Sequence, residues 1–206
     1  MFIEQPPLAY RLLFPEAIWR IKHKNRRVVY LTFDDGPVPE VTPWVLDLLD
    51  RYNIKATFFL VGDNVRRSPA LFEEIKRRGH SWGNHTMHHL QGMKVTSRRY
   101  MRDLTEADML INSSLFRPPH GLLRWKQANG IKTHYNIVMY DLVTRDYSRK
   151  LDGEQVLDNV KRFTRNGSII VFHDSLKAEK NMRYALPRAI KWLIAQGYEF
   201  EPLPMS

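Results

Sequence analysis

The sequence lacks cysteine, internal repeats and a long apolar run near its N-terminus. It has no cysteine, so no disulfide can stabilise it, which suits a reducing compartment and is also compatible with secretion of a metal-stabilised fold. No linker, internal repeat or low-complexity stretch divides the chain. Residues 1–25 have no apolar core of the length that a signal peptide needs, because charged side chains interrupt them, namely Glu4, Arg11, Glu16, Arg20 and Lys22. We therefore expect a cytoplasmic protein without a transmembrane segment.

Length and composition are those of one globular domain. With 206 residues and 43% hydrophobic content, the chain is long enough for one well-buried core and too short for a second. The net charge of +10 favours acidic partners such as anionic glycans, glycolipid precursors or lipid headgroups. Nucleic acid is not expected as a partner, because no nucleic-acid motif accompanies the basic clusters, and no protein partner is indicated.

Strands and helices alternate along the chain. Apolar runs rich in β-branched and aromatic residues predict strands over residues 26–33, 55–61, 80–84, 115–117, 135–143, 168–172 and 198–203. Amphipathic periodicity and capping residues predict helices over residues 42–52, 69–78, 96–112, 122–129, 153–165 and 181–196. Gly130 is the expected stop of the fourth helix, and Pro187 is expected to kink the last helix or to mark a later start. Because such strands pair in parallel through right-handed crossovers, about seven repeats predict a single-domain α/β fold, a distorted (β/α)7 barrel of TIM type.

The N-terminal segment, residues 1–25, allows two interpretations. Residues 8–21 are rich in aromatic side chains, and a basic run over residues 22–27 follows them. This combination suits peripheral contact with an anionic membrane. The alternative is a helix packed across the N-terminal end of the barrel.

Polar motifs follow five of the predicted strands, namely Asp34 with Asp35, His85 with His89, Arg117, Asp146 and His173. In barrels of this type, the carboxyl ends of the strands carry the active site. We therefore expect the five motifs to gather on one face as one site.

An acid pair ends the first predicted strand. Asp34 and Asp35 precede the turn-forming pair Gly36-Pro37. Successive side chains diverge at a strand end, so one carboxylate can bind a metal while the other stays free as a base. Taken alone, the same four residues are also typical of a hydrated turn.

Two histidines four residues apart follow the third predicted strand. At this spacing His85 and His89 meet on one face of a helical turn, which suits two neutral imidazoles that bind one divalent ion. Two imidazoles and one carboxylate, with a position left for water, are the ligand set expected of a catalytic zinc site. Asp35 is the candidate carboxylate, and His88 is expected to point elsewhere.

These motifs resemble those of the polysaccharide deacetylases with the NodB homology domain, also called carbohydrate esterase family 4. The resemblance extends roughly over residues 26–203. The five motifs of the family stand in order at residues 32–36, 85–89, 117–119, 143–147 and 171–173. The resemblance implies a catalytic domain over residues 26–206 and a hydrolase that removes acetyl groups from a carbohydrate.

The resemblance also implies a role for each motif residue. Asp35, His85 and His89 hold one divalent ion, usually Zn2+, with Co2+, Ni2+ or another divalent ion as alternatives; the ion polarises the carbonyl and lowers the pKa of its water. The developing oxyanion rests on the ion and on a backbone N–H near His120.

Four further residues complete the implied chemistry. Asp34 is the general base, which Arg117 holds by a charge-assisted hydrogen bond. His173 is the general acid, which Asp146 orients and keeps protonated. Each of these residues also has a structural interpretation when it is taken singly. An arginine such as Arg117 is typical of a surface ion pair, and an aspartate such as Asp146 is typical of a solvated loop. His173 followed by Asp174 is typical of a strand end that precedes a helix cap.

The expected substrate-binding residues are His120, Tyr147 and Val171. Val171 borders a pocket for the acetyl methyl group, and Tyr147 walls the groove. His120 stands where the family has an aromatic residue, so it binds substrate, offers a further metal ligand or fills the place of the aromatic ring. Val143 replaces an acid of the fourth motif, which removes a charge that would support Arg117.

Three functions fit these observations. The first is metal-dependent deacetylation of an N-acetylated sugar, with O-acetylated sugars as weaker candidates. The second is hydrolysis of a non-sugar amide at the same metal centre. The third is a catalytically silent barrel that binds carbohydrate, against which the presence of Asp34 argues, because a binder needs no free base beside the metal.

Overall fold

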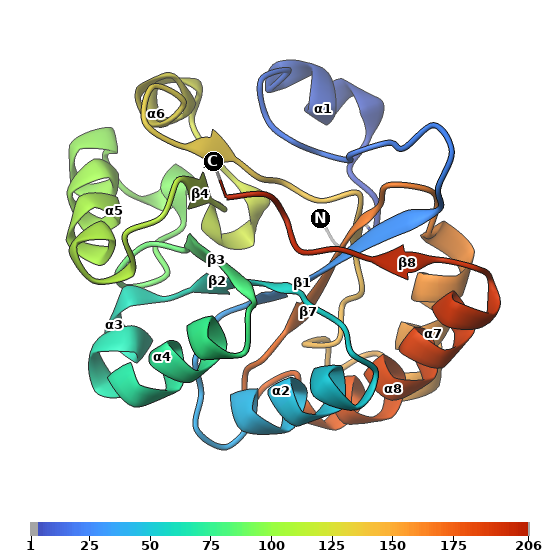
Figure 1. The fold of residues 1–206 in the computed structure, drawn as a ribbon. Helices are drawn as coiled ribbons and strands as arrows, with labels where there is room; N and C mark the ends of the chain where they lie inside the picture. Colours follow the sequence, from blue (N-terminus) through green and yellow to red (C-terminus); the bar gives the residue numbers. More distant parts are fainter. Residues whose placement is uncertain (1–3, 206) are drawn as a thin grey trace.

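The computed structural model describes residues 4–205, and residues 1–3 of the predicted N-terminal segment lie outside this range. Within it, eight strands form one sheet in the order β5-β4-β3-β2-β1-β7-β6, and β8 pairs with β1 beside this path. Each strand pairing is parallel. The strands are β1 Val28–Asp34, β2 Thr57–Leu60, β3 Ser81–Asn84, β4 Leu115–Phe116, β5 Asn136–Ile137, β6 Leu142–Val143, β7 Ile169–His173 and β8 Glu199–Phe200. The sheet curls into the distorted (β/α)7 barrel that the alternation predicts (Figure 1).

Helices cover the outside of the curled sheet (Figure 1). Over the described part of the chain they are α1 Leu8–Leu13, α2 Thr42–Arg51, α3 Gly62–Arg67, α4 Pro69–Arg77, α5 Ser97–Ile111, α6 Trp125–Ile131, α7 Gly153–Phe163 and α8 Glu179–Ala195. Thr96 caps α5, since its side chain accepts a hydrogen bond from the backbone N–H of Arg99. None of these helices has the length and apolar character needed to span a bilayer.

The prediction of one strand over residues 135–143 is wrong. The segment contains two short strands at opposite edges of the sheet, because β5 pairs with β4 and β6 pairs with β7. Between them the chain links the two edges, and the carbonyls of Val138 and Met139 accept hydrogen bonds from the guanidinium of Arg117 at 3.4 and 3.0 Å. A buried cation thus takes up backbone acceptors that a continuous strand would have paired in a ladder.

Two helix boundaries also differ from prediction. Helix α6 begins at Trp125, where the side chain of Gln127 accepts a hydrogen bond from the backbone N–H of Arg124 at 2.9 Å, and it continues through Gly130 to Ile131. Helix α8 begins two residues before the predicted start and runs from Glu179 through Pro187, so only the alternative of a later start is wrong. Helix α3 was not predicted, because its six residues are too few for a periodic pattern.

The core lies inside the barrel and between the sheet and the helices. All seven residues of β1 are buried. Phe33 of β1 stacks on Phe58 of β2 with ring centroids 5.0 Å apart, and Phe172 of β7 lies on its other side at 6.3 Å. The apolar interior fixes β1, β2 and β7 beside one another and therefore fixes the positions at which they end.

The segment before β1 lies along the β5–β6 side of the sheet. Its helix covers only Leu8–Leu13, and none of the six residues is buried. Arg11 pairs with the buried carboxylate of Asp141 at 2.9 Å, and Tyr10 donates a hydrogen bond to the carbonyl of Gly121. Further along, Ile18 forms a parallel bridge with Val138. Contact of this segment with a membrane stays a prediction.

Candidate active site

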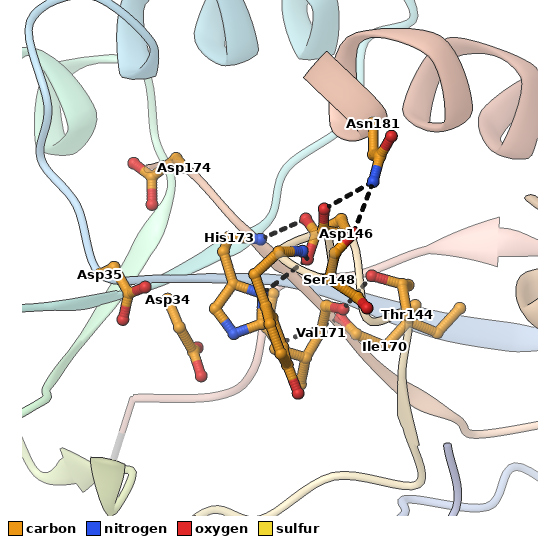
Figure 2. A network of polar contacts seen from close by, with 12 residues as sticks. Asp34, Asp35, Thr144, Asp146, Ser148, Ile170, Val171, His173, Asp174 and Asn181 are labelled. Carbon is orange, nitrogen blue, oxygen red and sulfur yellow. Dashed lines mark hydrogen bonds and ion pairs between the residues drawn. The ribbon is translucent and has the colours of Figure 1, made fainter. Parts of the chain in front are cut away.

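The five polar motifs meet at the carboxyl end of the sheet. Asp34 and His173 are register partners at the ends of β1 and β7, and the backbone N–H groups of His85 and Arg117 continue the ladder beyond β3 and β4. A pocket of about 580 Å³ opens there, and nine of the ten predicted site residues line it. The tenth, Asp146, does not line the pocket but bonds Nδ1 of His173 (Figure 2).

Three side chains on one wall of the pocket form a candidate metal site. Oδ1 of Asp35 lies 3.1 Å from Nε2 of His89 and 3.8 Å from Nε2 of His85, and the three ligand atoms all lie within 4.8 Å of one another. Ligands about 2.0 Å from a tetrahedral ion are about 3.3 Å apart, so the spacing and the donor set fit a zinc-type ion.

The protonation states of these groups also suit a metal. Burial lowers the pKa of His85 to about 4, so its ring is neutral at neutral pH, and Nδ1 bonds the carbonyl of Arg117 at 2.7 Å while Nε2 faces the cluster. Burial opposes ionisation of Asp35, yet the hydrogen bond with His89 and the charge of His173 hold its pKa well below the usual range.

The expected helical turn over residues 85–89 is wrong. Thr86 and His89 have positive φ angles of 66° and 52°, which no right-handed helical turn allows. The turn is held by side chains instead: Oδ1 of Asn84 accepts from the backbone N–H of Thr86 at 2.8 Å, and the hydroxyl of Thr86 accepts from the N–H of Leu90 at 3.1 Å. The two histidines therefore converge by loop geometry and not by helical spacing.

His88 points away from the metal-type cluster, as expected. Its Nδ1 lies 2.6 Å from Oδ1 of Asp103 on α5, and its backbone N–H donates to the other carboxylate oxygen at 3.0 Å. Asp103 is buried, and these two hydrogen bonds tie the loop that carries His88 to α5.

Asp34 is bound to a buried arginine. Nη1 of Arg117 lies 2.7 Å from Oδ1 of Asp34 and 2.7 Å from the hydroxyl of Thr32. The guanidinium also stacks over the ring of Phe59 at 4.0 Å and donates to two backbone carbonyls. These contacts orient Arg117 although Val143 stands where the family has an acid.

His173 and Asp146 form a second charged pair. Nδ1 of His173 lies 2.8 Å from Oδ1 of Asp146, and the backbone N–H of His173 donates to Oδ2 at 2.8 Å (Figure 2). Burial lowers the pKa of His173, but the charge and hydrogen bond of Asp146 outweigh it and raise the pKa to about 9. The ring is therefore protonated at neutral pH.

Two residues that support these pairs were missed in the sequence. Nδ2 of Asn181, on α8, donates to the carbonyls of Asp146, Ser148 and Leu151 at 3.1, 3.3 and 3.0 Å. Figure 2 shows this side chain above the loop that carries Asp146. A single Asn inside a helical pattern gives no signal of this role.

The second missed residue is Asp174, which does not cap a helix. Its buried carboxylate accepts from the backbone N–H of Gly36 at 3.1 Å and from the hydroxyl of Thr42 at 2.5 Å. A Cβ at Gly36 would lie 2.1 Å from Oδ2 of Asp174, so only glycine fits beside it. Burial raises the pKa of Asp174 to about 8. The residue fixes the turn that follows Asp35.

The three expected substrate-binding residues line the pocket. The ring of His120 lies 4.8 Å from that of His89, and its φ of 62° places it on a tight turn after Pro118-Pro119. The ring of Tyr147 meets that of His173 edge-on at 4.8 Å. Val171 is buried at the base, and Tyr140, which was not predicted, also lines the pocket.

The chain resembles known proteins over most of its length. Residues 21–134 match a family model described as polysaccharide deacetylase. A peptidoglycan-N-acetylglucosamine deacetylase of Bacillus cereus is 32% identical over 192 residues, which span 88% of this chain and 88% of that protein. A chitooligosaccharide deacetylase of a Bradyrhizobium species is 31% identical over 199 residues, which span 86% of this chain and 90% of that protein.

A solved structure shares the fold closely. The crystal structure of the Bc1960 peptidoglycan N-acetylglucosamine deacetylase matches with a TM-score of 0.87 and 29% identity, over 97% of this chain and 95% of that one. The family model covers more than half of the chain, and the B. cereus relative covers most of it. The chain therefore belongs to the polysaccharide deacetylase family and is a carbohydrate deacetylase.

Proposed function

We propose that this chain uses one divalent metal ion, Zn2+ before Co2+ or Ni2+, to remove acetyl groups from an N-acetylated carbohydrate, with O-acetylated carbohydrates as less favoured substrates. The observation that carries the proposal is the convergence of Asp35, His85 and His89 within 4.8 Å in the same pocket as Asp34 and His173. A divalent ion bound by these ligands supplies a Lewis acid for the acetyl carbonyl and lowers the pKa of a water.

Asp34 is the proposed general base. Its Oδ1 is taken by Arg117, whereas its Oδ2 lies 4.0 Å from Nε2 of His85 and faces the ligand cluster. Oδ2 is therefore the atom that accepts the proton of the attacking water. The charge-assisted hydrogen bond from Arg117 holds this carboxylate in place.

His173 is the proposed general acid. Because its Nδ1 is bound to Asp146, its Nε2 remains to give a proton to the leaving amine, so that acetate and a free amino sugar are released. The pKa of about 9 keeps this proton on the ring at neutral pH. Two groups with opposite tasks thus stand at the ends of adjacent strands.

The remaining pocket residues bind the substrate in this proposal. Val171 lies at the base, where an acetyl methyl group needs an apolar contact, and Tyr147 and His120 stand on two walls. The named activities of the B. cereus and Bradyrhizobium relatives support a glycan that contains N-acetylglucosamine, either peptidoglycan or a chitooligosaccharide.

The test combines metal analysis with acetate release. The purified chain is loaded with Zn2+ and assayed on chitooligosaccharides, peptidoglycan fragments and simple acetamides. We expect about one ion per chain and acetate from the sugars. A kcat/KM on simple acetamides equal to that on the sugars would favour the amidase alternative. Bound metal without hydrolysis of any acylated compound would refute both enzymatic hypotheses and favour a catalytically silent binder.

A further inference from the structure

A second pocket lies beside the active site and is lined by basic side chains. It measures about 510 Å³, and its charged lining comprises one carboxylate, Asp152, and four cations, Arg149, Lys150, Lys177 and Lys180. The carboxylate is already used, because Asp152 caps α7 by accepting a hydrogen bond from the backbone N–H of Gln155 at 2.9 Å. The pocket therefore carries a strong local excess of positive charge.

The four cations have no carboxylate of their own. Within residues 4–205 none of them lies in an ion pair, whereas Glu179, the acid between Lys177 and Lys180 in the sequence, pairs with Arg183 at 2.8 Å. All four are exposed at the pocket rim. Four unpaired like charges around one cavity repel one another, and a bound anion relieves that repulsion.

The pocket is built from two segments that are fixed to each other. Arg149 and Lys150 lie on the loop over residues 146–151, and Lys180 lies on α8. The three hydrogen bonds from the largely buried Asn181 tie this loop to the first turn of α8. The cations are thus held around one cavity by a shared anchor, which also positions Asp146 (Figure 2).

The pocket joins the active site directly. Lys177 lines both cavities. Its Nζ lies 5.3 Å from the ring centroid of Tyr147, and that ring contacts His173. A glycan that runs from His173 past Tyr147 would reach Lys177 and the other three cations.

We infer that this basic pocket binds an anionic substituent of the glycan, a carboxylate or a phosphate, and that the chain prefers an acidic acetylated glycan to a neutral one. The inference rests on the proposed function and names the substrate class for it. Lysine and arginine together bind either anion, so the two sources must be separated by experiment.

The test uses three N-acetylglucosamine oligomers of equal length. One is neutral, one carries a carboxylate on alternate sugars and one carries a phosphate there. Each is titrated by calorimetry into the metal-loaded Asp34→Asn chain, in which slow turnover keeps the oligomer intact, and acetate release is measured with the wild-type chain in parallel. The variants Lys180→Glu and Arg149→Glu/Lys180→Glu are compared with Lys191→Glu in the same background.

Lys191 is the matched control, because it is an exposed lysine about 16 Å further along the same helix, beyond the Debye length at 0.1 M salt. We expect at least one charged oligomer to bind more tightly than the neutral one. Lys180→Glu should reduce that preference about fivefold, the double variant more, and Lys191→Glu not at all. The preference should also weaken as NaCl is raised.

Two results would overturn the inference: equal binding of neutral and charged oligomers, or the same loss of preference in Lys191→Glu as in Lys180→Glu. The proposed function fails separately. If the wild-type chain releases no acetate from any oligomer while the preference for a charged one persists, the activity is refuted and the anion pocket is not; acetate release without a preference refutes the anion pocket alone.

Discussion

Replacing Asp146 by asparagine should move the alkaline limb of the pH–rate profile. Asp146 raises the pKa of the His173 ring to about 9, against an ordinary value of 6.5. This difference corresponds to about 3 kcal/mol of preference for the charged ring. Asparagine keeps the shape and one acceptor but removes the charge, so the pKa of His173 falls toward its ordinary value, because only the charges of Asp35 and Asp34 then oppose the effect of burial.

The size of the effect depends on pH. At pH 8.5 a ring with a pKa of about 9 is about three-quarters protonated, whereas one with a pKa of 6.5 is about 1% protonated. If His173 is the general acid, kcat/KM should fall by up to about 75-fold at pH 8.5 and by no more than about fourfold at pH 7. The assay is acetate release between pH 5.5 and 10, with metal content checked at each pH.

The stability of the fold should also decrease as the pH rises. A group whose pKa is raised in the folded state contributes to the free energy of unfolding below its ordinary pKa, and this contribution is lost as the pH rises through the folded value. In urea titrations the wild-type chain should therefore lose stability relative to Asp146→Asn between about pH 6.5 and 9. Asp158→Asn, an exposed acid on α7, is the control for the charge change. An alkaline limb that stays in place in Asp146→Asn would refute the role given to His173.

Three further changes test other parts of the structure. Arg117→Met should lower the free energy of unfolding by about 3–5 kcal/mol in urea titrations, because it leaves the carboxylate of Asp34 buried without its cation; a loss below about 1 kcal/mol would contradict this. Asn181→Ala should reduce kcat about 10- to 100-fold with metal content unchanged, since the loop over residues 146–151 loses three hydrogen bonds; unaltered kcat would show that the loop needs no such anchor. Helix α1 exposes three leucines, so the chain should cosediment with anionic vesicles and Leu12→Asp should weaken this, whereas equal sedimentation of both would contradict membrane contact.

The sequence predicted the barrel and the strand-end placement of the motifs because both depend on local patterns. Apolar runs that stop at Asp34, His85 and His173 show where strands end, and parallel pairing then brings those ends together. The division of residues 135–143 into two strands was not predictable in this way. Between the two strands, the carbonyls of Val138 and Met139 accept hydrogen bonds from the guanidinium of Arg117, and the local sequence pattern does not reveal this contact.

The sequence patterns predicted which residues gather at the pocket, but not the local backbone geometry that brings them there. The spacing of His85 and His89 suggested a helical turn, but the positive φ of Thr86 and of His89 creates a loop that spacing alone does not distinguish. Asp174 and Asn181 act on backbone groups far away in the sequence. Their residue types and positions carry no periodic or motif signal, so only the folded chain reveals them.

The central claim is that Asp34 is the general base beside a metal ion held by His85. The most direct test measures both the acetate release and the zinc content of the Asp34→Asn variant. The carboxylate of Asp34 accepts a hydrogen bond from Arg117 and is not one of the three metal ligands, so the variant should keep about one ion per chain. Its turnover should fall about 100- to 10,000-fold. His85→Ala, in contrast, should lose both metal and turnover. Wild-type turnover in zinc-loaded Asp34→Asn would contradict the claim.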